Sequence, residues 1–196
     1  RVTLLVLVNE IFANTGFQYS PATTPFADTS TTPTGPGHPG NPQPPLDYIH
    51  LTIAAGAQMV AQVSPAHGKL FVKTIEKALA SKGTSIVFIP APCISGWKFE
   101  DGETVQLATL GAQAGAYPAF VWEKGVGGAV KDCARDAKER PPIEEFLGLQ
   151  RRFHHMVQKD QATGRYVARP GREADLESLR GWVQGNVERL YALAEL

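Results

Sequence analysis

Two short segments carry the residue types that could bind a cofactor or a metal. The first runs from Asn9 to Gly16, reads NEIFANTG, and directly follows an apolar run. Asparagine side chains and backbone carbonyls supply the oxygen atoms that Mg²⁺ prefers, and Mg²⁺ commonly bridges to a phosphate. The structural alternative is a turn marked by Asn9 and Asn14, with Gly16 at a positive φ. Spacing alone favours that structural interpretation.

The second segment runs from Ala91 to Trp97, reads APCISGW, and also follows an apolar run. Cys93 could ligate a metal, although a lone free cysteine is more often a packing residue. The chain has 2 cysteines, too few for a disulfide framework, which favours a reducing, cytoplasmic setting. Any metal at Cys93 therefore needs ligands from elsewhere. We expect Cys133, which lies among charged residues, to be a surface thiol without a role.

Composition argues against two classes of partner. The chain has 19 Lys and Arg against 19 Asp and Glu, and no run of cations, so nucleic acid is not an expected partner. No apolar run approaches the roughly 20 residues that cross a bilayer, so a membrane is not expected either. The pair His154-His155 is adjacent in an expected helix, where neighbours do not face each other, so we expect no metal there.

Alternating apolar runs and amphipathic segments predict an α/β fold with a parallel sheet. Residues 2–8 are apolar throughout, which is typical of a strand buried on both faces. A long polar segment, 15–46, follows, too long for an ordinary connector. Further elements are predicted as listed here: strands at 58–63, 85–89 and 117–122, and helices at 47–56, 67–82, 103–115, 141–156 and 172–194.

This order of elements predicts where the two segments lie. Ligands of open parallel sheets bind beyond the carboxyl ends of the strands, so Asn9 and Cys93 are expected at one sheet edge. We divide the chain into residues 1–122, which carry the sheet, and residues 123–196, a C-terminal extension that begins with a polar loop. Its helices form either an arm that clasps another subunit or a self-contained cap.

Three segments in this order resemble one family. Residues 9–20 with Ala22-Thr23 and 31–35 look like the thiamine-diphosphate loop of pyruvate:ferredoxin oxidoreductases. The element at 91–97 looks like that family's isolated C-terminal cluster cysteine, and residues 140–153 are similar to its closing helix. The resemblance spans about residues 2–155 and implies the C-terminal part of the thiamine-diphosphate-binding (beta) subunit, with that family's parallel-sheet fold and a helical C-terminal arm.

The resemblance also implies roles for individual residues. Asn9 would bind Mg²⁺ through its side chain and Ile11 through its carbonyl. Asn14 would be catalytic, hydrogen bonding the oxygen of the bound 2-oxoacid that becomes negative. Cys93 would be one of the four thiolate ligands of a [4Fe–4S] cluster. The implied thiamine-binding residues are Asn9, Ile11, Phe12, Asn14, Thr15 and Gly16.

The implied reaction is oxidative decarboxylation of a pyruvate-like 2-oxoacid with CoA to acyl-CoA and CO₂, with electrons passed to the cluster and then to ferredoxin. Implied partners are the other oxidoreductase subunits, of alpha, gamma and delta type. Two family features are absent from these residues: a Gly-Asp-Gly segment whose Asp binds Mg²⁺, and three further cluster cysteines. Open alternatives are a relative acting on an aryl 2-oxoacid such as phenylglyoxylate or on oxalate, a cluster-free thiamine decarboxylase, and a non-catalytic assembly subunit.

Overall fold

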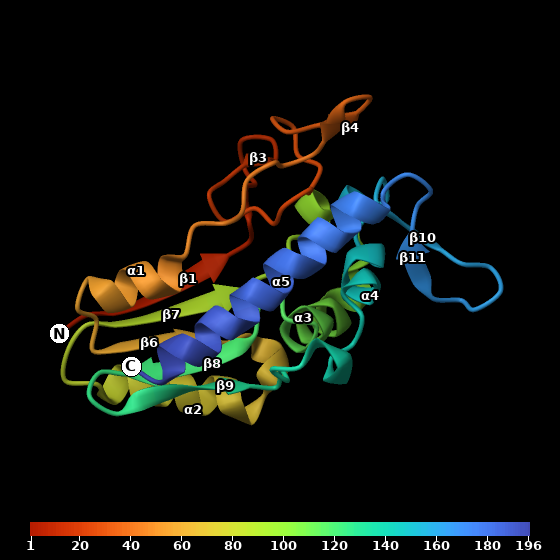
Figure 1. Ribbon diagram of the computed structural model, residues 1–196. Helices are drawn as coiled ribbons and strands as arrows, with labels where there is room; N and C mark the ends of the chain where they lie inside the picture. Colours follow the sequence, from red (N-terminus) through yellow and green to blue (C-terminus); the bar gives the residue numbers. More distant parts are fainter.

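The computed structural model describes residues 1–196, which contain a five-stranded mixed sheet with helices on both faces (Figure 1). In spatial order the strands are β1 (Thr3–Val8), β7 (Ser85–Pro90), β6 (Met59–Gln62), β8 (Ala119–Glu123) and β9 (Gly127–Lys131). The first three are parallel, and β8 and β9 are antiparallel to their neighbours. The α/β prediction is therefore confirmed, with an antiparallel hairpin added to the parallel strands.

Alternate residues of the central strands pack on opposite faces of the sheet. Val60 of β6 faces α1 (Tyr48–Ala54) and the end of α5 (Glu173–Ala194), where Ile49 and Leu190 join it in one buried cluster. Met59 and Ala61 face the other side, which α2 (Lys69–Ala80) covers. This period of two is the geometry of a strand buried on both faces. The central sheet is thus a rigid platform for the loops at its carboxyl edge.

Most predicted elements are confirmed within a few residues. α1 begins after Asp47, whose side chain accepts a hydrogen bond from the His50 backbone N–H at 3.1 Å. The 3₁₀ turn Pro65–His67 and α2 occupy the second predicted helix, and a further 3₁₀ turn, Asp101–Glu103, precedes α3 (Thr104–Gln113). A π-helical turn, Ile94–Lys98, follows Cys93. No helix is both long enough and apolar enough to span a bilayer.

β1 lies at the edge of the sheet, so the prediction that it is buried on both faces is wrong. Leu5 is 51% exposed and Leu7 is 71% exposed. β1 has one neighbour, β7, and its other edge carries no strand. An apolar run predicts that a strand is buried, but it does not indicate whether residues 1–196 are the ones that bury it.

Two predictions for the second half of the chain are corrected. Residues 123–140, predicted as a loop, contain β9 and the 3₁₀ turn Ala137–Glu139. The helix predicted at 141–156 is only α4 (Ile143–Gly148), followed by the 3₁₀ turn Arg151–Phe153. Gln150 has an extended backbone between them, which turns Arg152 into the interior. A short hairpin, β10 (Val157–Lys159) and β11 (Tyr166–Ala168), follows.

The C-terminal helix is a cap on the chain's own sheet, not an arm. α5 lies across the sheet in Figure 1 and packs against β8 and β9. Its buried residues recur at helical spacing: Leu176, Leu179, Val183, Val187, Leu190 and Leu193. The division proposed after Trp122 falls inside the β8–β9 hairpin, so residues 123–196 share the sheet and core with the preceding part.

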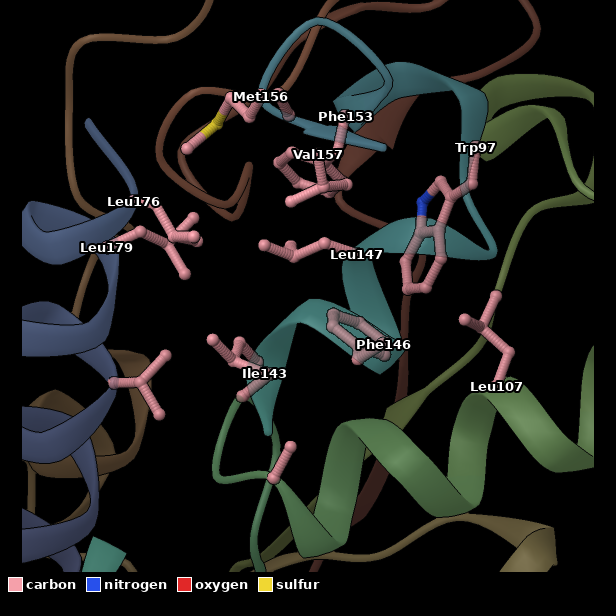
Figure 2. Close-up of a cluster of buried hydrophobic side chains, with 14 of the residues drawn as sticks. Trp97, Leu107, Ile143, Phe146, Leu147, Phe153, Met156, Val157, Leu176 and Leu179 are labelled. Carbon is pink, nitrogen blue, oxygen red and sulfur yellow. The ribbon is translucent and has the colours of Figure 1, made fainter. Parts of the chain in front are cut away.

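A further buried cluster fills the space beyond the carboxyl ends of the strands. Figure 2 shows Trp97, Leu107 and Phe146 on one side of this cluster, and Leu176 and Leu179 of α5 on the other. Phe153, Met156 and Val157 close its far end. The cluster packs the segment that follows Cys93 against α3, α4 and α5.

The long segment before α1 is mostly irregular, as predicted, but it is firmly held. It contains two short antiparallel pairs, β2 (Ile11–Phe12) with β3 (Gln18–Tyr19) and β4 (Thr34–Gly35) with β5 (His38–Pro39). Asn41 is fully buried, and its side-chain amide donates to the carbonyls of Thr23, Thr24 and Gln43. These bonds replace the regular ladder that the segment lacks.

Candidate cofactor site at the carboxyl ends of β1 and β7

The two chemically suggestive segments lie at the same edge of the sheet, as predicted. β1 and β7 are paired in parallel with Val8 opposite Pro90. The Ala91 backbone N–H donates to the Val8 carbonyl at 2.9 Å, just before the two chains diverge. Asn9 and Cys93 therefore start from neighbouring points, although 84 positions separate their numbers in the sequence.

An open hollow of about 400 Å³ lies beside the end of β1. That volume is within the range of small-molecule sites. Three of the predicted cofactor-binding residues, Asn9, Ile11 and Phe12, are in its wall. The remaining lining residues are mostly apolar: Val6, Leu7, Val8, Glu10, Ser20, Ala22, Tyr48 and Phe88. An apolar wall with a few oxygen atoms suits an organic cofactor with one polar end.

Asn9 is held by contacts on both its side chain and its backbone. Its Oδ1 accepts a hydrogen bond from the Ile11 backbone N–H at 3.3 Å. Its carbonyl accepts one from Trp97 Nε1 at 2.9 Å. The indole of the Cys93 segment thus fixes the backbone of the residue predicted to bind Mg²⁺.

Glu10 has a role that the sequence did not reveal. Its backbone adopts φ = 68°, in the left-handed region that non-glycine residues rarely occupy. Its carboxylate is 1% exposed and receives a bidentate ion pair from Arg152, at 2.6 Å from Nη1 and 3.1 Å from Nη2. The Thr24 backbone N–H and hydroxyl also donate to it, at 2.9 Å and 3.0 Å. Both carboxylate oxygens are therefore fully engaged.

Arg152 is the centre of this buried network. Its guanidinium lies 4.0 Å from the centroid of the Trp97 ring, a cation–π contact, and its Nε donates to Gln150 Oε1 at 2.8 Å. Burial lowers the pKa of Arg152, while the Glu10 carboxylate opposes that shift. An arginine keeps its proton in proteins, so the pair is ionic. The only sequence signal was that both residues lie in family-like segments.

The Cys93 segment packs directly onto the turn of residues 9–11. A Cβ atom at Gly96 would lie 1.9 Å from Ile11 Cδ1, closer than any atoms can approach without a shift. Glycine at this position therefore permits contact between the two segments. With the Trp97 bond to Asn9, this contact fixes the distance between the two predicted ligand sets.

Asn14, Thr15 and Gly16 lie outside the wall of the hollow. All three are exposed in the turn between β2 and β3. Thr15 Oγ1 donates to Gln18 Oε1 at 2.6 Å, and Gly16 has φ = 116°, which requires glycine. The structure thus brings Asn9, Ile11 and Phe12 together at the hollow and leaves the other three exposed in the β2–β3 turn.

The cysteines and histidines separate into different environments. Cys93 is half-buried and free, and it stands beside the hydrophobic cluster of Trp97. Cys133 is 7% exposed, so the expectation of a surface thiol is wrong, and burial raises its pKa. His154 and His155 bond to different carbonyls, those of Gly148 and Pro39. No three His, Cys, Asp or Glu residues lie close enough together to hold a metal alone.

Comparisons with known proteins agree on the kind of domain. Residues 1–89 match the family described as thiamine pyrophosphate enzyme, C-terminal TPP binding domain. The chain is 33% identical, over 96% of its length and 55% of the relative, to the VorB subunit of ketoisovalerate oxidoreductase from Pyrococcus abyssi. It is 29% identical to the PorB subunit of pyruvate synthase from Thermotoga maritima, over 100% of this chain and 56% of that one. It therefore spans about half the length of the curated relatives it matches.

A solved 2-oxoglutarate:ferredoxin oxidoreductase from Magnetococcus marinus is 25% identical, over 54% of this chain and 42% of that one, with a TM-score of 0.42. That likeness is too weak to carry an argument.

Proposed function

We propose that this chain works within a complex that oxidatively decarboxylates a 2-oxoacid. The reason is that it belongs to the thiamine-diphosphate-binding beta subunits of the 2-oxoacid:ferredoxin oxidoreductase family. The products are acyl-CoA and CO₂, and the electrons pass to ferredoxin through a [4Fe–4S] cluster. The observation that carries the proposal is the meeting of the Asn9 and Cys93 segments at one sheet edge, joined by the Trp97 hydrogen bond.

The residues present fit thiamine diphosphate with Mg²⁺. Mg²⁺ takes near-octahedral oxygen ligands and is usually held by few protein groups together with substrate phosphates and water. Asn9 Oδ1 and the Ile11 carbonyl would supply two such oxygens beside a hollow of about 400 Å³. Phe12 and the apolar wall would bind the rest of the cofactor. When bound, thiamine diphosphate supplies the stabilised carbanion chemistry that decarboxylation needs.

The chain's own residues would orient the substrate and hold charge. Asn14 is exposed in the β2–β3 turn, and its amide N–H would donate to the 2-oxoacid oxygen that becomes negative. Thr15 and Gly16 would close the β2–β3 turn over the diphosphate. Buried ion pairing at Glu10 holds the strained backbone of the turn in place before any ligand arrives.

Cys93 would supply one of the four thiolate ligands of a [4Fe–4S] cluster. It is a free, half-buried thiol, and the chain holds no second group of ligands beside it. A cluster takes four thiolates, so the other three would come from protein outside these residues. A thiolate-bound cluster and two free cysteines suit a reducing compartment, and we place the complex in the cytoplasm.

The substrate we propose is an aliphatic 2-oxoacid, since the named relatives act on ketoisovalerate and pyruvate. An aryl 2-oxoacid such as phenylglyoxylate is the second candidate, favoured by Phe12, which is 57% exposed in the wall of the hollow. Partner subunits of the alpha, gamma and delta type, CoA and ferredoxin complete the proposed assembly.

Cluster content in the full complex tests the proposal. Cys93→Ala is compared with the matched control Cys133→Ala by iron analysis and by EPR of the reduced protein. The proposal expects Cys93→Ala to lose one cluster signal and ferredoxin reduction, whereas Cys133→Ala keeps both. Retention of every cluster signal and of normal ferredoxin reduction in Cys93→Ala would remove the redox part of the proposal.

A further inference from the structure

We infer that Arg152 is a positioning residue for the metal-binding turn: through Glu10 it holds Asn9 and Ile11 at the hollow. This inference rests on the proposed function, because it assigns a task at the site proposed for Mg²⁺ and the diphosphate. Arg152 touches neither the hollow nor any predicted ligand atom, and it lies 142 positions from Glu10 in the sequence.

Glu10 occupies the central position of the turn. It stands between the two predicted Mg²⁺ ligands, Asn9 and Ile11, so its backbone sets the direction in which each leaves the turn. Its φ of 68° is costly for a residue with a side chain, and such a conformation persists only where surrounding contacts enforce it. Its carbonyl accepts hydrogen bonds from the hydroxyls of Ser20 and Thr23, and its carboxylate is held by Arg152.

The Glu10 carboxylate requires a planar, bidentate cation as its partner. Both Arg152 and Glu10 have fully buried side chains, and an unpaired charge at that depth is strongly unfavourable. The two guanidinium nitrogens each meet a different carboxylate oxygen, which fixes the rotation of the carboxylate as well as its distance. A lysine ammonium is a point charge and fixes the distance alone.

Arg152 also holds the segment that follows Cys93. Its guanidinium lies under the Trp97 ring at 4.0 Å, and Trp97 in turn donates to the Asn9 carbonyl. Gly96 brings the same segment against the side chain of Ile11. One buried cation therefore contacts both Glu10 and Trp97, and through them it sets Asn9 and Ile11 relative to the proposed cluster ligand.

A purely structural ion pair is the competing explanation, and charge-neutral variants separate the two. Arg152→Met leaves Glu10 as a lone buried carboxylate and is expected to lower the melting temperature. Glu10→Gln with Arg152→Met leaves no buried charge, so we expect the melting temperature to recover toward wild type. The carboxylate–guanidinium geometry is still absent from the double variant, so a positioning role predicts that cofactor binding does not recover.

The experiment uses the full complex, stripped of thiamine diphosphate and Mg²⁺ and titrated with both. The readouts are the Mg²⁺ concentration for half-maximal thiamine diphosphate binding, by calorimetry, and the melting temperature. We expect a rise of about 10- to 100-fold in that Mg²⁺ concentration for the double variant, the usual cost of losing a group that orients a metal ligand. Arg152→Lys keeps the charge for folding and should show a rise in the same direction.

The matched control is Arg180→Met, which leaves the buried carboxylate of Glu144 without its ion-pair partner at a place away from the hollow. It should lower the melting temperature and leave the Mg²⁺ dependence unchanged. Recovery of both melting temperature and Mg²⁺ dependence in the double variant, or a wild-type Mg²⁺ dependence in Arg152→Lys, would overturn the inference. Failure of the proposed function looks different: the wild-type complex itself would bind no thiamine diphosphate with Mg²⁺, and the inference would fall with it.

Discussion

Asn14 occupies the exposed β2–β3 turn and does not line the hollow. A group that acts on the developing charge of the substrate contributes mainly in the transition state, so its loss appears in kcat. We predict that Asn14→Ala lowers kcat about 100- to 1000-fold while thiamine diphosphate binding changes far less. Steady-state kinetics and cofactor titration of the complex measure both. Normal turnover with weakened cofactor binding would reassign Asn14 to the structure of the loop.

The two cysteines should differ in reactivity. Cys93 is half-buried, whereas Cys133 is 7% exposed and has a pKa raised by burial, so less of it is thiolate near neutral pH. We predict that iodoacetamide labels Cys93 faster than Cys133 in the cluster-free chain at pH 7.5, as followed by peptide mass spectrometry. Faster labelling of Cys133 would contradict its burial in the structure.

At the scale of elements, α5 is an integral cover of the sheet. Leu190 is 1% exposed against Val60 and Phe120, so Leu190→Ala should cost about 2–5 kcal/mol of unfolding free energy. Glu188→Ala, on the exposed side of the same helix, should stay within about 0.5 kcal/mol. Urea denaturation of the chain measures both. Equal, small effects would indicate that α5 does not stabilise the sheet of this chain and is instead an arm that folds on a partner.

Local patterns predicted most elements but not their surroundings. Apolar runs placed β1, β6 and β7, and Asp47 and Gly83 marked helix limits, because these signals depend on neighbouring residues. The exposure of β1 depends on what lies across its free edge, which local pattern does not report. β9 was missed because Gly127 and Gly128 read as loop, although they pair with β8. α4 ends early because Arg152 must turn inward to meet Glu10, a tertiary demand that overrides helical pattern.

The sequence predicted which residues lie at the candidate site, but it did not predict the buried contacts that hold them in place. Strand ends and family resemblance indicated Asn9, Ile11 and Cys93, and the parallel pairing of β1 and β7 brings their segments together. Nothing local marked Glu10 or Arg152 as partners, since exposed ion pairs and buried ones use the same residue types. The Gly96 contact with Ile11 was likewise invisible, because it depends on the fold bringing distant segments together.

At the scale of the whole molecule, charge and shape point to association through β1. The formal net charge is +0, so long-range repulsion between copies is weak, and β1 presents an unpaired edge with Leu4, Leu5 and Leu7 exposed. We predict that the chain alone self-associates and that Leu5→Lys reduces this, whereas Val126→Lys in the exposed β8–β9 turn does not. Sedimentation velocity distinguishes these outcomes. Equal association of both variants would place the contact elsewhere.

We propose that Asn9 and Ile11 hold the metal and diphosphate of the thiamine cofactor at the end of β1. The most direct test is a structure of the full complex with thiamine diphosphate, in which Mn²⁺ replaces Mg²⁺ and is located by its anomalous signal. We predict Asn9 Oδ1 and the Ile11 carbonyl at bonding distance from the metal, about 2.1–2.2 Å. A metal more than about 4 Å from Asn9, beyond any coordination distance for such a cation, would contradict the assignment.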